Sequence, residues 1–172
     1  MFCTALCTLF NKLKEWNSDV IISAAFYGDP HGNKQTIPLY QDLKAMCDAK
    51  IDYYNYQSYA NWVDSVPKIE AAIKYVGDPG TGFGWEKLVW GVGVGGQTGN
   101  TAWRWWPSDP GLAAYNIMQE LLRVAPSHAG AFTWAGEFSE QSCDPAWCIE
   151  QRLADMYAGG TGDHGACTCH SG

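Results

Sequence analysis

One unit recurs four times along this chain of 172 residues, and it constrains the fold more than any other feature. The unit is a short apolar strand, a loop marked by Gly or Pro, and a helical stretch. The predicted strands span 20–26, 51–59, 88–94 and 129–135. Their starts are therefore 31, 37 and 41 residues apart, which suits parallel strands joined by crossover helices. The first run is almost wholly apolar and rich in β-branched residues, so it is predicted to be buried on both faces.

Helical stretches are predicted at 3–16, 68–76, 110–124 and 145–157, and a further one is flanked by Asp42 and Asp48. In the first of these, apolar residues recur at three- and four-residue steps until Asn17, Ser18 and Asp19 end the pattern. The predicted order is α-(βα)4, within one domain over residues 1–158. Residues 159–172 are rich in Gly and Cys, and we expect them to form a flexible tail.

Four βα units fit either half of a closed barrel or a doubly wound open sheet, and periodicity alone does not separate the two. The long loops lie at 26–38, 59–67, 95–109 and 134–144. All of them follow the C-terminal ends of strands, where barrels carry their functional loops. The predicted fold is therefore α/β, half of a (β/α)8 TIM barrel. Half a barrel leaves open strand edges and an uncovered inner face, so we expect a partner: a second copy, or a complementary N-terminal half-barrel chain.

The composition narrows the classes of ligand. The net charge is −7 and the eleven Lys and Arg residues are scattered, which argues against nucleic acid because phosphate backbones are bound by clustered basic residues. No apolar run approaches the ~20 residues of a membrane span. Nine Trp residues provide flat faces that stack on sugar rings or fill an interior. Carbohydrate is therefore a reasonable ligand class.

Seven Cys residues leave at least one thiol outside any closed set of disulfides. Cys143 and Cys148 can close a small loop, which would indicate an oxidising compartment, although the N-terminus shows no clear secretory signal. Cys3 and Cys7 lie one helical turn apart, too far for an easy disulfide within a helix. We expect these two in the core or at an interface.

Three further motifs have competing interpretations. The loop after the third strand contains Trp103, Arg104, Trp105 and Trp106, which either stack on sugars or form a self-packed or subunit-covered patch. His164, Cys167, Cys169 and His170 lack the usual ligand spacing, so no metal is expected. The glycine run from Gly91 matches no phosphate-binding pattern, so no cofactor is expected and close strand packing explains it better.

Four segments resemble, in order, the fifth to eighth strands of the plant-type, class III chitinases of glycoside hydrolase family 18. Ile51-Asp-Tyr-Tyr-Asn-Tyr-Gln-Ser-Tyr-Ala-Asn61 is similar to the sixth strand, where an Asp-Tyr start leads to Gln-x-Tyr-Asn-Asn. Ala129-Gly-Ala-Phe-Thr-Trp-Ala-Gly-Glu-Phe138 resembles the eighth, which delivers a Trp to the barrel mouth. Ile21-Ile-Ser-Ala-Ala resembles the fifth and Lys87-Leu-Val-Trp-Gly-Val-Gly-Val the seventh. The resemblance spans roughly residues 3–158.

The resemblance implies hydrolysis of β-1,4-linked N-acetylglucosamine polymers with retention, in which the substrate's own acetamide acts as nucleophile. By their matching positions, Tyr59 would steady the acetamide, Gln57 would lie beside it, and Trp134 would form the pocket floor. Asn61 keeps the second Asn of the motif, whereas Ala60 replaces the first.

The family's general acid has no counterpart here. The family's acid is a Glu at the end of the fourth strand, in the signature Asp-x-x-Asp-x-Asp-x-Glu, and these 172 residues do not contain that signature. Glu137 and Asp29 are weak substitutes, since a general acid also needs a raised pKa and reach to the leaving oxygen.

Three hypotheses follow. The first is a catalytically inactive, chitinase-like protein that binds chitin or N-acetylglucosamine oligosaccharides. The second is a structural or assembly subunit that pairs its open half-barrel with another chain, as a homo-oligomer or with a complementary half. The third is an active glycosidase completed by a separate N-terminal half. The family and the Cys content favour an extracellular location.

Overall fold

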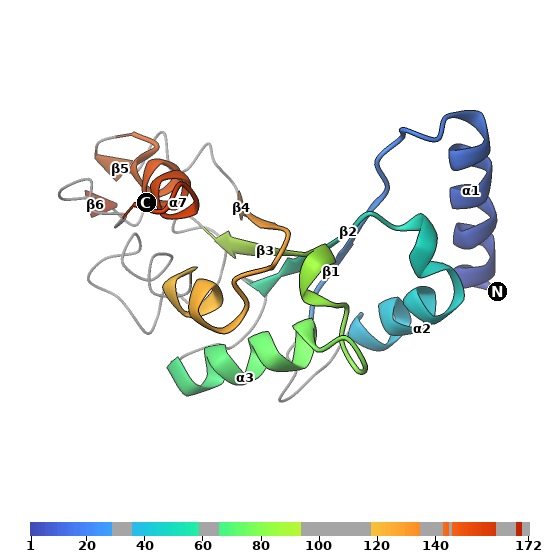
Figure 1. Ribbon diagram of the computed structural model, residues 1–172, viewed down its shortest axis with the longest axis horizontal. Coiled ribbons are helices and arrows are strands. Elements are labelled where there is room, and N and C mark those ends of the chain that lie inside the picture. The colour runs from blue at the N-terminus through green and yellow to red at the C-terminus, as the bar shows by residue number, and fades with distance from the viewer. Residues whose placement is uncertain are drawn as a thin grey trace.

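A four-stranded parallel sheet forms the centre of the molecule (Figure 1). The computed structural model describes residues 1–28, 36–58, 66–93, 118–134, 143–144, 146–160 and 168–169; for a few of these, including Trp134, it describes only the backbone. The strands are β1 (Ser23–Phe26), β2 (Tyr53–Gln57), β3 (Leu88–Gly93) and β4 (Gly130–Trp134). Each lies within the run predicted for it.

The order of the strands separates the two predicted architectures. Neighbours follow chain order, β1-β2-β3-β4, and all three pairs are parallel. In a doubly wound sheet the strand order reverses at a switch point. In a barrel, by contrast, each strand lies beside the next one in the chain. The predicted α/β fold, a partial (β/α)8 barrel, is therefore confirmed.

Helices form an arc along one side of the sheet, with α1 at one end and α7 at the other (Figure 1). They are α1 (Phe2–Trp16), α2 (Ile37–Cys47), α3 (Val66–Gly77), helical residues 118–124, and α7 (Cys148–Tyr157). Single 3-10 turns, Asp48–Lys50 and Trp85–Lys87, lead into β2 and β3. Two residues of the predicted tail form β6 (Thr168–Cys169), which pairs antiparallel with β5 (Cys143–Asp144). None of the helices in the described part of the chain is long and apolar enough to cross a membrane.

The face of the sheet that the helices cover, its outer face, holds the core. Its buried members are Ala24, Phe26, Tyr54, Tyr56, Leu88, Trp90 and Val92. The Phe26 ring centroid lies 4.1 Å from that of Phe83 and 5.9 Å from that of Tyr40 in α2. Large aromatic rings therefore fill the layer between strands and helices, where they gain most from burial.

The opposite, inner face is open at β1. Ser23, Ala25 and Tyr53 are exposed there, whereas Ala24, Phe26 and Tyr54, which point to the outer face, are buried. The prediction that the first strand is buried on both faces is therefore wrong. The physical reason is that no segment among the described residues covers the inner side of β1.

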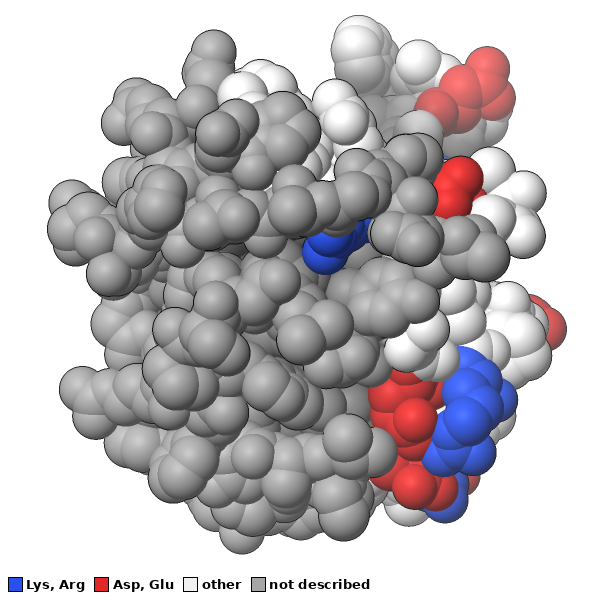
Figure 2. Space-filling model, turned by 90° about the vertical axis from the view of Figure 1, so that its left-hand side faces the viewer, with Lys and Arg blue, Asp and Glu red and all other residues white. Residues whose placement is uncertain are grey.

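A cluster of ion pairs lies on the outer helices, and one of the pairs joins α3 to helical residues 118–124. Glu70 of α3 pairs with Lys74 at 2.5 Å and with Arg123 of helical residues 118–124 at 3.4 Å, and Arg123 also contacts Glu120. Figure 2 shows acidic and basic side chains side by side on this side of the molecule. Like other exposed ion pairs, the Glu70–Lys74 pair contributes little to stability.

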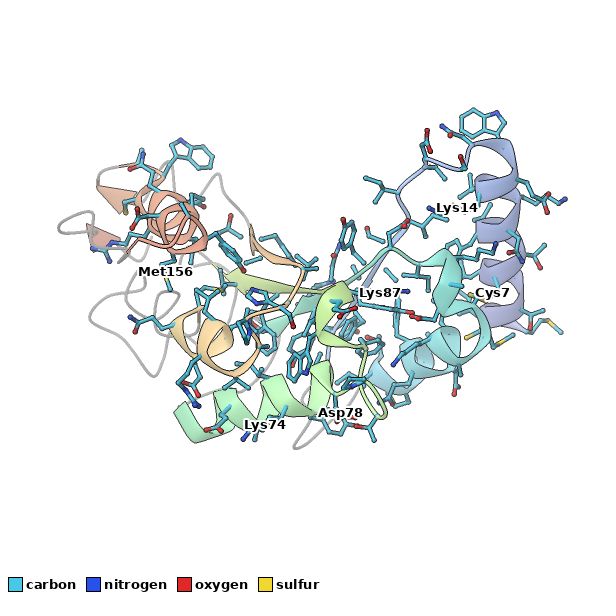
Figure 3. The ribbon with its side chains drawn as sticks, viewed as in Figure 1. Cys7, Lys14, Lys74, Asp78, Lys87 and Met156 are labelled. Atoms are coloured by element: carbon cyan, nitrogen blue, oxygen red, sulfur yellow. A yellow bond between two sulfur atoms is a disulfide. The ribbon has the colours of Figure 1, made fainter. Side chains whose placement is uncertain are left out.

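Helix α1 is fastened to the rest of the fold by a disulfide and an ion pair (Figure 3). Cys7 is bonded to Cys47 at the end of α2, with the two Cα atoms 5.7 Å apart. Lys14 lies 2.9 Å from Asp52, which also accepts a 2.7 Å hydrogen bond from the Ile22 amide. The sequence did not reveal the disulfide because its cysteines are 40 residues apart, and pairing cannot be deduced from spacing alone.

Removing the Cys7–Cys47 bond should destabilise the chain markedly. For a separation of 40 residues, loop-closure entropy predicts a loss of about 4 kcal/mol in the free energy of unfolding for Cys7→Ser with Cys47→Ser. Urea denaturation under oxidising conditions measures it. Cys3→Ser is the matched control, since Cys3 is a free thiol on the same helix. Equal stability of the two variants would contradict a structural role for the bond.

The Asp52 carboxylate should make stability depend on acid pH. The Ile22 amide and then Lys14 hold the pKa of Asp52 below its usual value of 3.8. The contribution of Asp52 to the free energy of unfolding is therefore present above about pH 4. It is lost as the pH falls through the lower pKa that Asp52 has in the folded state. Asp52→Asn should lower the free energy of unfolding more at pH 6 than at pH 2.5, as measured by denaturation across pH. The exposed Asp42 provides the control variant Asp42→Asn, and a loss independent of pH would contradict the assignment.

Candidate functional site

The C-terminal ends of β2, β3 and β4 bring together the part of the predicted site that the structure describes. Gln57 is the last residue of β2 and pairs with Gly91, which in turn pairs with Phe132; Gly93 pairs with Trp134. These residues occupy alternate positions, opposite to the buried Tyr56, Trp90 and Val92. They therefore share the inner face at the end of the strands where barrel enzymes place their sites.

The ring of Phe132 lies between the backbone positions of Gln57 and Trp134, the two predicted sugar-contacting residues that the structure places. A Cβ atom at Gly91 would lie 2.3 Å from the Phe132 ring, so only glycine lets the ring cross β3 at this point. The ring thus lies in the middle of the inner face, with Gln57 one strand away on β2. The glycine run was predicted to serve close packing, and at Gly91 it does.

Buried hydroxyl groups fix the position of Gln57. Tyr56 donates a 3.0 Å hydrogen bond to the carbonyl oxygen of Gly28, beyond β1. Ser58, only 5% exposed, donates a 2.6 Å bond to the carbonyl oxygen of Gly91. Tyr56 and Ser58, the residues on either side of Gln57, are thus hydrogen-bonded to the segments next to β2. These bonds fix the backbone of Gln57, whose side chain is half-buried.

Most of the other predicted site residues lie outside the described part of the chain. This applies to Asp29, Tyr59, Asn61, Trp103, Arg104, Trp105, Trp106 and Glu137. For Trp134 the backbone is placed and the side chain is not described. The structure therefore brings Gln57 and the Trp134 backbone to one face of one mouth, two strands apart, and leaves the remaining positions as predictions.

Phe132 and Trp147 are two aromatic residues that the sequence reasoning missed. A signal existed for Phe132, since it lies two positions before Trp134 and so on the same face of a strand. Trp147 precedes α7, is 40% exposed and has a φ of 62°, a left-handed conformation that is uncommon for a bulky residue. The next residue, Cys148, is buried and disulfide-bonded. An exposed indole is thus held beside a fixed anchor, and no sequence pattern signals it.

The described carboxylates with shifted pKa values lie away from this mouth. Asp52 and Asp78 precede β2 and β3, at the opposite ends of the strands, and Glu70 lies on α3. All three pKa values are lowered, by the Ile22 amide at Asp52, by the Thr81 amide at Asp78 and by Lys74 at Glu70. These groups are held ionised at neutral pH, which is the reverse of what a general acid requires.

A pocket of about 370 Å³ lies at this opposite end of the strands, against Phe83, Trp85 and Lys87. Its lysines are already engaged: Lys87 lies 3.0 Å from Asp48, and Lys44 donates to the carbonyl oxygen of Gly82 at 2.8 Å. Within the described residues, no group of three or more His, Cys, Asp or Glu side chains is placed to hold a metal ion. The end of the strands at Gln57 is therefore the better candidate.

Comparison with known proteins gives structural matches only. No family model matches the sequence, and no curated protein matches it. The catalytic domain of a family GH18 chitinase from the fern Peteris ryukyuensis matches with a TM-score of 0.61 at 18% identity, covering 89% of this chain and 49% of that one. A GH18 chitinase from Pseudoalteromonas aurantia matches with a TM-score of 0.59 at 20% identity, covering 77% of this chain and 48% of that one. The chain thus spans about half the length of the solved structures it matches and shares their fold over that half.

Gly91 and Phe132 should be energetically coupled. Gly91→Ala places a methyl group against the ring, and such overpacking costs about 1–3 kcal/mol of unfolding free energy. In a Phe132→Ala background the same substitution should cost much less, because the ring is gone. A double-mutant cycle by urea denaturation measures the coupling, and additive effects would show that the ring does not lie across Gly91.

Proposed function

We propose that this chain is the sugar-holding half of a chitinase-like barrel, that it binds β-1,4-linked N-acetylglucosamine oligosaccharides, and that it does not hydrolyse them by itself. One observation carries the proposal: Gln57 of β2 shares the inner face of the sheet with Phe132 and the Trp134 backbone of β4, toward the C-terminal ends of these strands. The structural matches, both of them chitinases by name, support the choice of sugar.

The described side chains have suitable chemistry for an acetamido sugar. The amide of Gln57 can both donate to and accept from an acetamide group, and the ring of Phe132 provides an apolar surface for a sugar face. Tyr59, Asn61, Trp134 and the Trp103, Arg104, Trp105 and Trp106 loop are proposed as further contacts on the basis of the sequence. Strands β1 to β4 are proposed to correspond to barrel strands 5 to 8 of the class III chitinases.

Inactivity of the isolated chain is proposed from two observations. The acidic signature of the family is not part of these 172 residues. The described carboxylates with shifted pKa values are held ionised at the far end of the strands or on α3. Glu137 and Asp29 are the remaining candidates for a substitute acid, and a chain that supplies the missing strands could restore turnover.

An extracellular location is proposed from the cysteine chemistry. Cys7 and Cys47 form a disulfide, and Cys148 is bonded as well. Disulfides persist in oxidising compartments and are rare in the cytosol. A second role, as one half of an assembled barrel, is favoured by the exposed inner face of β1.

Binding is tested by calorimetric titration of the purified chain with chitotetraose. Gln57→Ala should weaken binding about tenfold, since the lost hydrogen bonds are worth roughly 1–1.5 kcal/mol. Gln151→Ala, an exposed glutamine on α7, is the matched control and should bind as the parent chain does. Cellotetraose, which lacks acetamide groups, should bind more weakly than chitotetraose.

Two outcomes would overturn the proposal. One is the absence of any heat of binding to chitotetraose by the folded chain. The other is steady release of chitobiose by the purified chain that Glu137→Gln abolishes, since this would identify an active enzyme with a replacement acid.

A further inference from the structure

An exposed apolar surface lies at the β1 end of the sheet. Its members, with their exposed fractions, are Phe2 55%, Leu9 50%, Trp16 78%, Ile21 70% and Tyr53 39%. We call it the β1-end surface. Isolated exposed apolar residues are ordinary, but several of them at one end of a sheet indicate a site of interaction.

Helix α1 has two apolar stripes, and only one of them packs within the described chain. Phe2, Leu9 and Trp16 are seven residues apart, which places them on one side of the helix. The other stripe, which includes Cys7, Phe10 and Leu13, packs against the core. Phe2 also lines a groove of about 440 Å³ between α1 and α2, together with Leu39 and Met46.

The same surface continues onto the sheet. Ile21 precedes β1 by two residues and alternates with the exposed Ser23 and Ala25, so it belongs to the inner face. Tyr53 pairs with Ser23 on the neighbouring strand. Among the described strands β1 is an edge strand, which offers backbone hydrogen-bonding groups to a further parallel strand. A helix stripe, a strand edge and an inner face are therefore exposed together.

We infer that the β1-end surface docks a (βα)3β unit, whose last strand pairs in parallel with β1 and whose last helix packs against Phe2, Leu9 and Trp16. A closed barrel needs eight strands and eight helices. This chain spans about half of each matched chitinase. Its described residues contribute four strands to the parallel sheet, and helix α1 precedes the first of them. A partner with four strands and three helices therefore completes it.

A second copy of this chain does not fit, because one helix too many would meet at each junction. In a two-copy barrel, β4 of one copy would lie beside β1 of the other. Helix α7 follows β4 and α1 precedes β1, so both would compete for the single helix position over that pair of strands. A (βα)3β unit ends on a strand, and α1 then serves as the helix that crosses from this strand to β1.

Neither helix is free to move aside. The Cys7–Cys47 disulfide and the Lys14–Asp52 ion pair hold α1 at its position beside α2 and β2. Helix α7 is held by its buried Leu153 and Met156 and by the hydroxyl of Tyr157, which hydrogen-bonds Nε2 of the buried His128. In a two-copy barrel, α1 of one copy and α7 of the other would therefore clash at both junctions.

The test uses the 172-residue chain, alone and co-expressed with the first half of the fern chitinase catalytic domain, cut after its fourth strand. Light scattering during size-exclusion chromatography gives the masses. We expect a monomer alone and a one-to-one complex with the fern half. Leu9→Lys in the stripe should lower the yield of complex at least tenfold, whereas Thr8→Lys, at an exposed position on the polar side of α1, should not.

Leu9 is exposed, so its substitution should leave the fold intact, as circular dichroism can verify, and Ile21→Asp on the inner face provides a second variant. A stable dimer of the chain alone would overturn the inference in favour of a second copy. A folded monomer that forms no complex with the fern half would also overturn it. Complex formation is measured without sugar, so the inference and the proposed oligosaccharide binding can fail separately.

Discussion

Every strand of a parallel sheet has two faces that need cover, and the helices of this chain cover one. The rest of the structure depends on this asymmetry. On the outer face, rings of Phe26, Tyr56 and Trp90 pack within 5.1 Å of a neighbour, centroid to centroid, and this layer provides the apolar burial that holds the half-barrel together. On the inner face, the strands present their other side chains to a space that the described chain leaves open at β1.

The hydroxyl groups of the outer layer connect core packing to the candidate site. Tyr56 and Ser58 are buried on the outer face, yet they donate hydrogen bonds to the backbone carbonyl oxygens of Gly28, just beyond β1, and of Gly91, within β3. A buried hydroxyl must find a partner, so these bonds are required by the same burial that forms the core. The position of Gln57 between them is therefore a consequence of folding and needs no ligand to establish it.

The sequence predicted the strands and helices well and predicted side-chain environments less well. Apolar runs located the four strands because both core packing and barrel closure favour such residues at these positions. The apolar run at β1 led to the wrong prediction that this strand is buried on both faces. Ile21 and Ala25 suit the interior of a closed barrel, and the sequence alone does not show that the described chain leaves them uncovered. Gln57 was found through a motif, and Phe132 was missed because its place depends on the absence of a side chain at Gly91 on the neighbouring strand. The left-handed Trp147 and the Cys7–Cys47 pair depend on tertiary context that no local pattern encodes.

The proposed partner and the proposed sugar would both contact the inner face, but at opposite ends of the strands. The apolar residues Ile21 and Tyr53 lie at the N-terminal ends of β1 and β2, in the layer that closes the bottom of a barrel. Gln57 and Phe132 lie near the C-terminal ends, in the layer that opens to solvent at the mouth. Closing the barrel would bury the first layer and leave the second accessible, with more walls around it. A partner would therefore increase the enclosure of a sugar without competing for its contacts, because the two sets of residues occupy different layers of the same face.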